Sequence, residues 1–335
     1  MRRFIVLFVA VTLLGGVLLG LHQPVASRAE ATAEPTAEAT AVIPNDLVGK
    51  IAFVSETSSD TQIYIMNADG TELHAVVKGD RVPWSPALSP DGKQIAFSAK
   101  VNERYQIFVM NSDGTDEKQL TFNVNGQTGV SGLDWSHDGK RLVYTIKTSD
   151  NPNIQSYDIY TMNVDGTEQK EITPQPMESL LSPHWSPDDK QIIFDARGNS
   201  PEDASKAVDP AVPAHIYIIN ADGSNLHRLS QSTYNELFPA WSPDGKTIVF
   251  LSGGASKEMF GLYRIDVDGS NLTQLSKTLY SMPTWSPDGK YLAAVLSEKI
   301  NDKWVSNVYI MNADGTNPVK ITDTQDLYHL PSWSK

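Results

Sequence analysis

Six short motifs in this sequence could supply oxygen ligands for a metal ion. Each places an aspartate between an asparagine or aspartate and a glycine, and the motifs begin at Asn67, Asn111, Asn163, Asn220, Asp266 and Asn312. An EF-hand calcium loop begins in this way, but it also needs a glutamate at its twelfth position and lies between helices. None of the six motifs has that context. We therefore predict structural turns, with neither a metal site nor a cofactor; a single Ca²⁺ in a central channel is the alternative.

Histidines and acids are the other groups that could do chemistry. The seven histidines form neither a His-x-His nor a His-Glu-x-x-His pattern, and the chain contains no Gly-x-Ser-x-Gly elbow and no phosphate loop. His184 and Asp134 occupy equivalent places in two neighbouring repeats, so a His–Asp pair is one interpretation, and simple packing or solvation is the favoured one. The sequence predicts no catalytic residue.

The charge and the composition argue against several classes of partner. The 335 residues carry 27 Lys and Arg against 40 Asp and Glu, which gives a formal net charge of -13. This balance opposes a nucleic-acid partner and electrostatic docking on anionic lipid. The chain has no cysteine, which excludes disulfides, thiolate metal sites and a cysteine nucleophile.

The amino terminus has the pattern of an export signal. Arg2 and Arg3 precede an apolar run over 4–21, and small residues follow. We predict a signal peptide or an uncleaved signal anchor over 1–29, followed by a disordered Ala/Thr/Glu/Pro tether over 30–45. Both interpretations place the remainder outside the cytoplasm, as a periplasmic, secreted or membrane-anchored protein. Contact with the membrane would come only through an uncleaved anchor.

A second motif recurs between the aspartate turns. Trp-Ser-Pro-Asp-Gly-Lys is complete from Trp241 and from Trp285, and it has His137 for proline in one copy and Asp189 for glycine in another. Both motifs fit a type I turn followed by a residue with positive φ, which is a three-residue hairpin loop. The β-branched and aromatic runs between the turns therefore predict antiparallel strands.

Four such strands per repeat, apolar on both faces, are typical of the blade of a β-propeller. Residues 46–335 hold six repeats of about 48 residues each. We predict an all-β fold, a six-bladed β-propeller of four-stranded antiparallel blades over 46–335. The segment around Trp333 supplies a first strand without its second, and 49–55 supplies a second strand without its first. One blade shared between the chain ends would therefore close the ring, and we expect a monomer.

These repeats resemble those of the TolB-type propellers. The resemblance lies in Pro-x-Trp-Ser-Pro-Asp-Gly-Lys, an apolar strand, and Ile-Tyr-x-Met-Asn-x-Asp-Gly-Thr, which recur over 46–335. In TolB itself the propeller follows an α/β domain, whereas here only the leader and the tether precede it. TolB binds a peptidoglycan-associated lipoprotein in the periplasm, so the resemblance implies an extracytoplasmic propeller with a protein partner. Similar repeats build the propellers of dipeptidyl-peptidase and prolyl-oligopeptidase relatives.

The connections between strands that vary in length are expected on the face opposite the Asp-Gly turns, and binding residues concentrate on such loops. Counting back four and five positions from each repeat tryptophan gives a ring of residues at the mouth of the central channel. The candidate binding residues of this ring are Trp84, Ser131, Leu181, Glu236, Leu237, Tyr280, Ser281, Tyr328 and His329. They either form a binding rim or close the top of the core.

Two functions are compatible with this pattern. The first is a non-catalytic binding or scaffold module for a protein, a peptide or a cell-envelope component. The second is a propeller enzyme that acts on a glycan or a peptide, with channel carboxylates such as Glu178 and Glu236 assembled from separate blades. Two carboxyl groups about 5 to 9.5 Å apart would favour glycoside chemistry. The lack of a linear catalytic motif favours the binding module.

Overall fold

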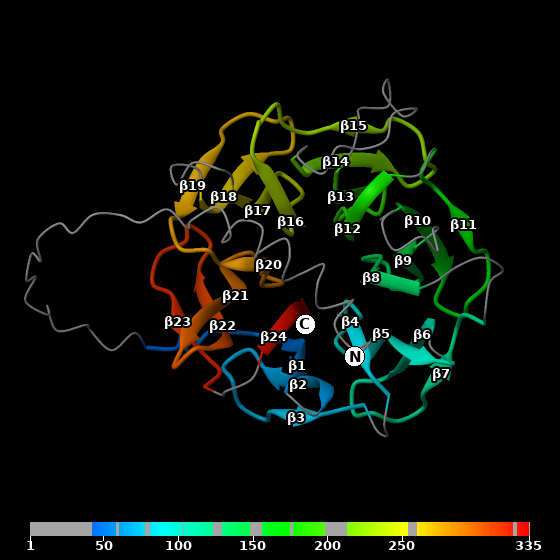
Figure 1. Cartoon of the computed structure of the whole chain (residues 1–335), viewed down its shortest axis with the longest axis horizontal. Helices are drawn as coiled ribbons and strands as arrows, with labels where there is room; N and C mark the ends of the chain where they lie inside the picture. Colours follow the sequence, from blue (N-terminus) through cyan, green and yellow to red (C-terminus); the bar gives the residue numbers. More distant parts are fainter. Residues whose placement is uncertain are drawn as a thin grey trace, which may run out of the picture.

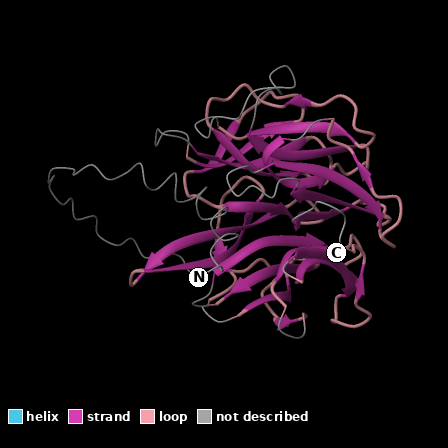
Figure 2. Ribbon diagram, turned by 45° about the vertical axis from the view of Figure 1, so that its right-hand side comes forward, coloured by secondary structure: helices cyan, strands magenta, loops and turns pink. Residues whose placement is uncertain are grey.

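The computed structural model describes residues 42–57, 60–77, 81–102, 104–122, 129–147, 156–174, 177–197, 213–253, 260–323 and 327–334. Within these ranges the chain forms 24 β-strands. Figure 2 shows strands and loops and no helix in this part of the chain. Accordingly, this part of the chain contains no helix that could span a membrane. The predicted leader and nearly all of the predicted tether lie outside the described residues.

Six four-stranded antiparallel blades form a closed ring, which confirms the predicted fold (Figure 1). In each blade the first strand lies nearest the centre of the ring and the fourth lies at its edge. Blade 1 consists of β24 (Leu327–Ser334), β1 (Lys50–Glu56), β2 (Thr61–Asn67) and β3 (His74–Ala75). Blade 2 consists of β4 (Pro83–Leu88), β5 (Gln94–Val101), β6 (Arg104–Asn111) and β7 (Lys118–Gln119). Blade 3 consists of β8 (Gly129–Trp135), β9 (Arg141–Lys147), β10 (Ser156–Asn163) and β11 (Lys170–Glu171).

The second half of the ring repeats this arrangement. Blade 4 consists of β12 (Met177–Trp185), β13 (Gln191–Arg197), β14 (His215–Asn220) and β15 (His227–Arg228). Blade 5 consists of β16 (Asn235–Trp241), β17 (Thr247–Gly253), β18 (Gly261–Asp266) and β19 (Thr273–Ser276). Blade 6 consists of β20 (Ser281–Trp285), β21 (Tyr291–Ile300), β22 (Lys303–Asn312) and β23 (Val319–Lys320). The beginnings of β10 and β12 also pair, which joins blades 3 and 4 into one eight-stranded sheet.

Both ends of the propeller sequence build blade 1, as the repeat pattern predicts. Strand β24 pairs antiparallel with β1, and the two lie side by side near the centre of Figure 1. The indole Nε1 of Trp333 donates to the carbonyl oxygen of Val48 at 2.8 Å. On blade 6, the hydroxyl of Tyr291 donates to Asp46 Oδ1 at 2.6 Å. The segment that precedes β1 is therefore fixed across the joint between blades 6 and 1.

The core lies between the blades because each sheet is apolar on both faces. Between blades 1 and 6, the buried side chains of Ile51 and Phe53 pack with Val308. Removing a side chain of this size from water contributes about 1.5–3 kcal/mol. The repeat tryptophans are buried between blades as well, and Trp135 Nε1 donates to the carbonyl oxygen of Ala87 in the preceding blade at 2.9 Å.

The aspartate motifs form the predicted hairpin turns. In the first turn, the amide of Gly70 donates to the carbonyl oxygen of Asn67 at 2.9 Å, and Thr71 Oγ1 donates to Asp69 Oδ1 at 2.6 Å. The hydrogen bond from Thr71 lowers the pKa of Asp69. Gly70 has φ +85°, and a Cβ there would lie 2.9 Å from the carbonyl oxygen of Ile321 in the neighbouring blade 6, so the turn requires glycine. The carboxylate of Asp69 therefore stabilises the turn in which it lies.

Candidate functional site

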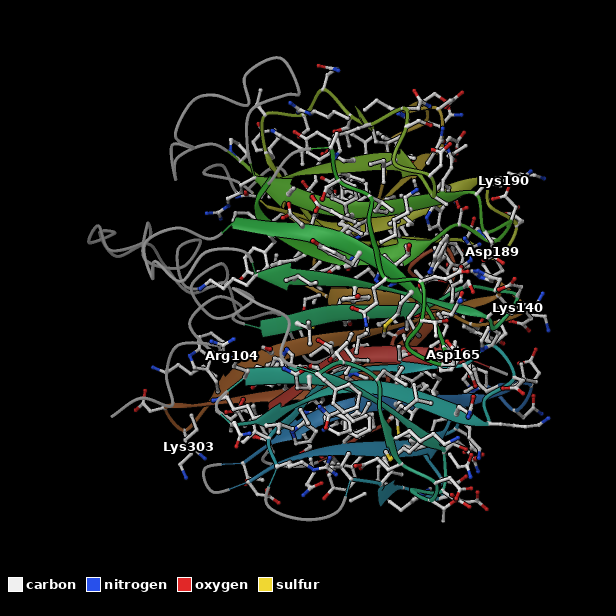
Figure 3. All side chains as sticks on the ribbon, turned by 90° about the vertical axis from the view of Figure 1, so that its right-hand side faces the viewer. Arg104, Lys140, Asp165, Asp189, Lys190 and Lys303 are labelled. Atoms are coloured by element: carbon white, nitrogen blue, oxygen red, sulfur yellow. The ribbon has the colours of Figure 1, made fainter. Side chains whose placement is uncertain are left out.

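The hairpin turns and the longer connections lie on opposite faces of the ring. Figure 3 shows Lys140, Asp165 and Lys190 of the turns on one side, and Arg104 and Lys303 on the other. We call the side of Arg104 and Lys303 the variable face. The candidate ring from the sequence belongs to the innermost strands at this end.

An irregularity near this end of the innermost strands changes where their side chains point. The register of the innermost strand against its neighbour shifts in all six blades. Three positions before the repeat tryptophan, or its counterpart Leu88, φ is positive, between 49° and 59°, at Ser85, Gly132, Ser182, Phe238 and Met282. Such a β-bulge adds a residue and re-aims the neighbouring side chains. Residues at the channel mouth therefore do not follow simple alternation.

The described residues of the predicted ring divide into two half-buried and five buried side chains. Trp84 and Leu181 are half-buried. The buried members are Glu236, Leu237, Tyr280, Ser281 and His329. Ser131 and Tyr328 lie in β8 and β24, and their side chains lie outside the described part of the chain. The more accessible members thus belong to blades 2 and 4.

Trp84 and His329 meet across the joint between blades 1 and 2. Their ring centroids are 5.6 Å apart, with the planes inclined at 40°. His329 is 7% exposed, and its Nε2 has no hydrogen-bond partner among the described residues. Burial lowers the pKa of His329 to about 4, so the imidazole is neutral at pH 7. The half-buried indole of Trp84 therefore offers a partner an apolar contact, and the buried, neutral imidazole of His329 packs against it.

Glu236, a predicted channel acid, connects blades 4 and 5. It is 1% exposed, accepts a hydrogen bond from Ser230 Oγ at Oε1, and accepts one from the amide of Ile216 at Oε2, at 3.5 Å. His215 Nδ1 lies 3.6 Å from the same Oε2. In three other blades the amide equivalent to that of Ile216 donates its hydrogen bond to a threonine hydroxyl, namely that of Thr121, Thr173 or Thr322. The carboxylate of Glu236 therefore takes the structural role that a threonine hydroxyl has in those three blades. The side chain of Glu178, the second predicted acid, lies outside the described residues.

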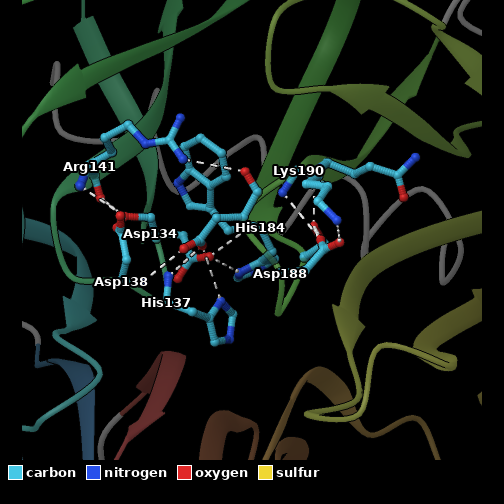
Figure 4. Close-up of polar contacts among 12 residues, drawn as sticks. Asp134, His137, Asp138, Arg141, His184, Asp188 and Lys190 are labelled. Carbon is cyan, nitrogen blue, oxygen red and sulfur yellow. Dashed lines mark hydrogen bonds and ion pairs between the residues drawn. The ribbon is translucent and has the colours of Figure 1, made fainter.

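Two His–Asp contacts join the turn ends of blades 3 and 4 (Figure 4). His184 Nδ1 lies 3.5 Å from Asp134 Oδ2, which also accepts the amide of Trp185 at 2.9 Å. His137 Nδ1 lies 3.7 Å from Asp189 Oδ1. The pairing of His184 with Asp134, the less favoured interpretation of the sequence, is therefore present. Within the described ranges, no group of three or more His, Asp or Glu side chains could hold a metal ion.

Sequence reasoning missed two buried acids, Asp158 on β10 and Asp195 on β13, and the more deeply buried of them is Asp195. Its side chain is fully buried, and its Oδ1 accepts the amide of Phe238, on the bulge of the next blade, at 3.2 Å. Burial raises the pKa of Asp195 to about 8. The equivalent residues of the other blades are uncharged: Val54, Ser98, Thr145, Leu251 and Val295. Aligning the second strands of the six repeats would have revealed the exception.

Comparison with protein families identifies the class of protein that this ring represents. A model described as the TolB beta propeller domain matches residues 41–212, and one described as the eukaryotic translation initiation factor eIF2A matches residues 127–330. The first match covers half of the chain and includes strands β1 to β13, from blade 1 to the first half of blade 4. The chain therefore belongs to the TolB β-propeller family.

Individual relatives match part of the chain in sequence, and a solved structure matches most of it in fold. An uncharacterized protein of Agrobacterium fabrum is 28% identical over 174 residues, which are 48% of this chain and 53% of that protein. The Tol-Pal system protein TolB of Francisella tularensis subsp. mediasiatica is 35% identical over 102 residues, 29% of this chain and 22% of that one. The crystal structure of TolB from Acinetobacter baumannii has a TM-score of 0.69 at 22% identity and covers 87% of this chain and 68% of that chain. The chain thus spans 53% and 22% of the two relatives found by sequence, and the structural likeness shows the fold.

Proposed function

We propose that the protein is an extracytoplasmic, non-catalytic binding module that takes a protein, a peptide or a cell-envelope component at its variable face. The observation that carries this proposal is the contact of Trp84 with His329 at the channel mouth. It combines a half-buried indole, which a partner can reach, with a buried, neutral imidazole that packs against it. Apolar contact area with a few placed polar groups is typical of a binding site, and tryptophan often dominates its binding energy.

The family supports the proposed partner and compartment. TolB relatives carry a name that assigns them to the Tol-Pal system. The export-like pattern over 1–29 would deliver this chain outside the cytoplasm. We infer that an envelope protein or peptide is the partner and that it contacts Trp84 and His329 together with the half-buried Leu181 of blade 4.

A crosslinking experiment with a matched control tests the proposal. A photoactivatable amino acid would replace Trp84 on the variable face in one strain and Lys190 on the turn face in another. We expect a partner-specific adduct from position 84 and none from position 190, because the two positions lie on opposite faces. An adduct from position 190 alone would contradict the proposal. No adduct from either would also contradict it, and would direct work to glycan and peptide hydrolysis screens, the test of the enzyme alternative.

A further inference from the structure

The hairpin of β21 and β22 in blade 6 projects from the variable face. Its strands have ten residues each, whereas β5 and β6, which form the equivalent hairpin of blade 2, have eight. At about 3.3 Å per residue, the additional residues lengthen the hairpin by about 7 Å. Its loop consists of Asn301 and Asp302, whose φ angles of 49° and 63° fit a type I′ turn. Figure 3 shows Lys303, the residue after this turn, on the variable face.

The outer end of β21 has no strand beside it on the side of β20. Pairing between β20 and β21 ends at Ser281 and Val295, whereas β21 stays paired with β22 as far as Ile300. The carbonyl oxygen of Val295 accepts the hydroxyl of Ser281 at 3.2 Å, so it points toward β20. Alternate residues of a strand direct their backbone groups to the same side, so those of Ser297 and Lys299 point the same way. Within the described part of the chain, no backbone group pairs with them on that side.

This edge of the hairpin is accessible, unlike the opposite edge. On β22, Ser306 is fully buried. On β21, Ser297 is half-buried and Lys299 is exposed. The tip also carries two large apolar side chains, Ile300 and Trp304, each of which is 45% exposed. A partner can therefore reach both the free backbone groups and apolar side chains.

The two faces of the hairpin present different side chains beside this edge. Lys299 lies on one face, opposite Trp304, and Ile300 lies on the other, opposite Lys303. Asp302 Oδ1 lies 2.9 Å from Lys299 Nζ, but the side chain of Asp302 is 95% exposed. Such an ion pair contributes little, so Lys299 can exchange it for another carboxylate. A strand added at the edge would place alternate side chains beside Lys299 and beside Ile300, where an acidic and an apolar residue fit.

We propose that β21 binds an extended segment of a partner protein by strand addition at Ser297 and Lys299, and that apolar residues flank an acidic one in this segment. Main-chain hydrogen bonds would hold the segment, and its alternate side chains would select it. A second copy of this chain fits the edge poorly, because a lysine on an edge strand opposes pairing of like strands. A membrane also fits poorly, because hydrocarbon does not tolerate an open sheet edge and the net charge of -13 opposes anionic lipid.

A synthetic pentapeptide tests strand addition in the full-length protein. Acetyl-Thr-Val-Glu-Val-Thr-amide has the proposed pattern, and acetyl-Thr-Val-Lys-Val-Thr-amide reverses its charge. In amide NMR spectra we expect the first peptide to shift the amide protons of Ser297 and Lys299 downfield, with a Kd in roughly the millimolar range. The second peptide should bind at least about threefold more weakly. No shift at these two amides, or equal affinities of the two peptides, would overturn the proposal.

Two variants at one position separate the backbone of Lys299 from its side chain. Lys299→Pro removes the amide hydrogen on the open edge and leaves the hydrogen bonds between β21 and β22 in place, so it should weaken binding at least about tenfold. Slow hydrogen exchange at the amide of Val305, which pairs with Glu298 across the hairpin, shows that the hairpin is intact. Lys299→Ala keeps the backbone amide and should weaken binding at most about threefold. Equal affinities of the two variants would contradict strand addition.

Vesicles of phosphatidylcholine and phosphatidylglycerol in a ratio of three to one test the membrane as the alternative occupant. We expect Trp304→Ala to leave vesicle binding unchanged. Loss of vesicle binding in this variant would assign the hairpin tip to a lipid surface and overturn the proposal. The edge of β21 shares no residue with the contact of Trp84 and His329, so the crosslinking result at Trp84 tests a separate proposal.

Discussion

Two departures from the turn motif occur in neighbouring blades and complement each other. Where blade 3 has His137 in place of proline, blade 4 has Asp189 in place of glycine. The amide of His137 donates to Asp189 Oδ1 at 2.6 Å, and the amide of Asp138 donates to Oδ2 at 2.9 Å. A proline has no amide hydrogen, so the hydrogen bond from residue 137 to Asp189 forms only because histidine stands there in place of proline. At the next joint the ring of Pro187 lies 3.7 Å from where a Cβ of Gly245 would stand.

The two substitutions should therefore be energetically coupled. A hydrogen bond to an ionised group is worth about 1.5–3 kcal/mol, and we take the lower end because His137 is 45% and Asp189 is 15% exposed in their side chains. His137→Pro alone should cost about 1.5 kcal/mol. Asp189→Gly should cost about 1 kcal/mol, because losing the bonds is partly offset by relief of the positive φ of 58°. The double variant recreates the proline–glycine contact and should cost less than about 1 kcal/mol, a coupling of roughly 1.5–2 kcal/mol.

Urea unfolding of the four proteins at pH 7 measures this coupling. As a control, Pro187→His and Gly245→Asp would install the same pair between blades 4 and 5. There each single change should destabilise the propeller, and the double change should recover part of the loss. Additive costs within about 0.5 kcal/mol at the joint between blades 3 and 4 would refute the reasoning.

Three further predictions concern buried titratable groups and ring closure. Because burial lowers the pKa of His329 to about 4, this imidazole binds a proton more readily in the unfolded chain than in the folded one. The stability that neutral His329 contributes is therefore complete above pH 6.5 and is lost as the pH falls toward 4. His329→Asn should flatten that loss when melting temperatures are measured in acid. Because burial raises the pKa of Asp195 to about 8, its contribution is present below pH 4 and is lost as the pH rises to 8; Asp195→Asn should remove this decline, and an unchanged pH profile would contradict it. Deletion of 329–335 removes most of the strand that pairs with β1, so the melting temperature should fall by more than about 10 °C, whereas Lys190→Ala should leave it unchanged.

The repeats predicted the fold well because their signals are local and occur six times. The Asp-Gly turns, the apolar strands and the split first blade each follow from short stretches of sequence. The pairing of Tyr157 with Met177, which joins blades 3 and 4, carries no comparable local signal, since it depends on how two connections meet in space.

The candidate ring was harder to predict because a bulge interrupts each innermost strand. Tyr280 illustrates the difficulty: counting placed it at the channel mouth, and the structure packs it against Tyr309 with ring centroids 5.5 Å apart. Glu236 is drawn into blade 4 by Ser230, a partner that spacing along the chain does not identify. Trp84 lies near the beginning of the propeller sequence and His329 near its end, and they meet only because the ring closes.

The most direct test of the central claim is the affinity of the crosslinked partner for purified variants. Trp84→Ala removes the half-buried indole of the variable face, and Lys190→Ala changes an exposed side chain of the turn face. We predict that the first variant raises the Kd at least about tenfold and that the second leaves it unchanged. An unchanged Kd for Trp84→Ala, or a loss of affinity caused by Lys190→Ala, would contradict binding at the variable face.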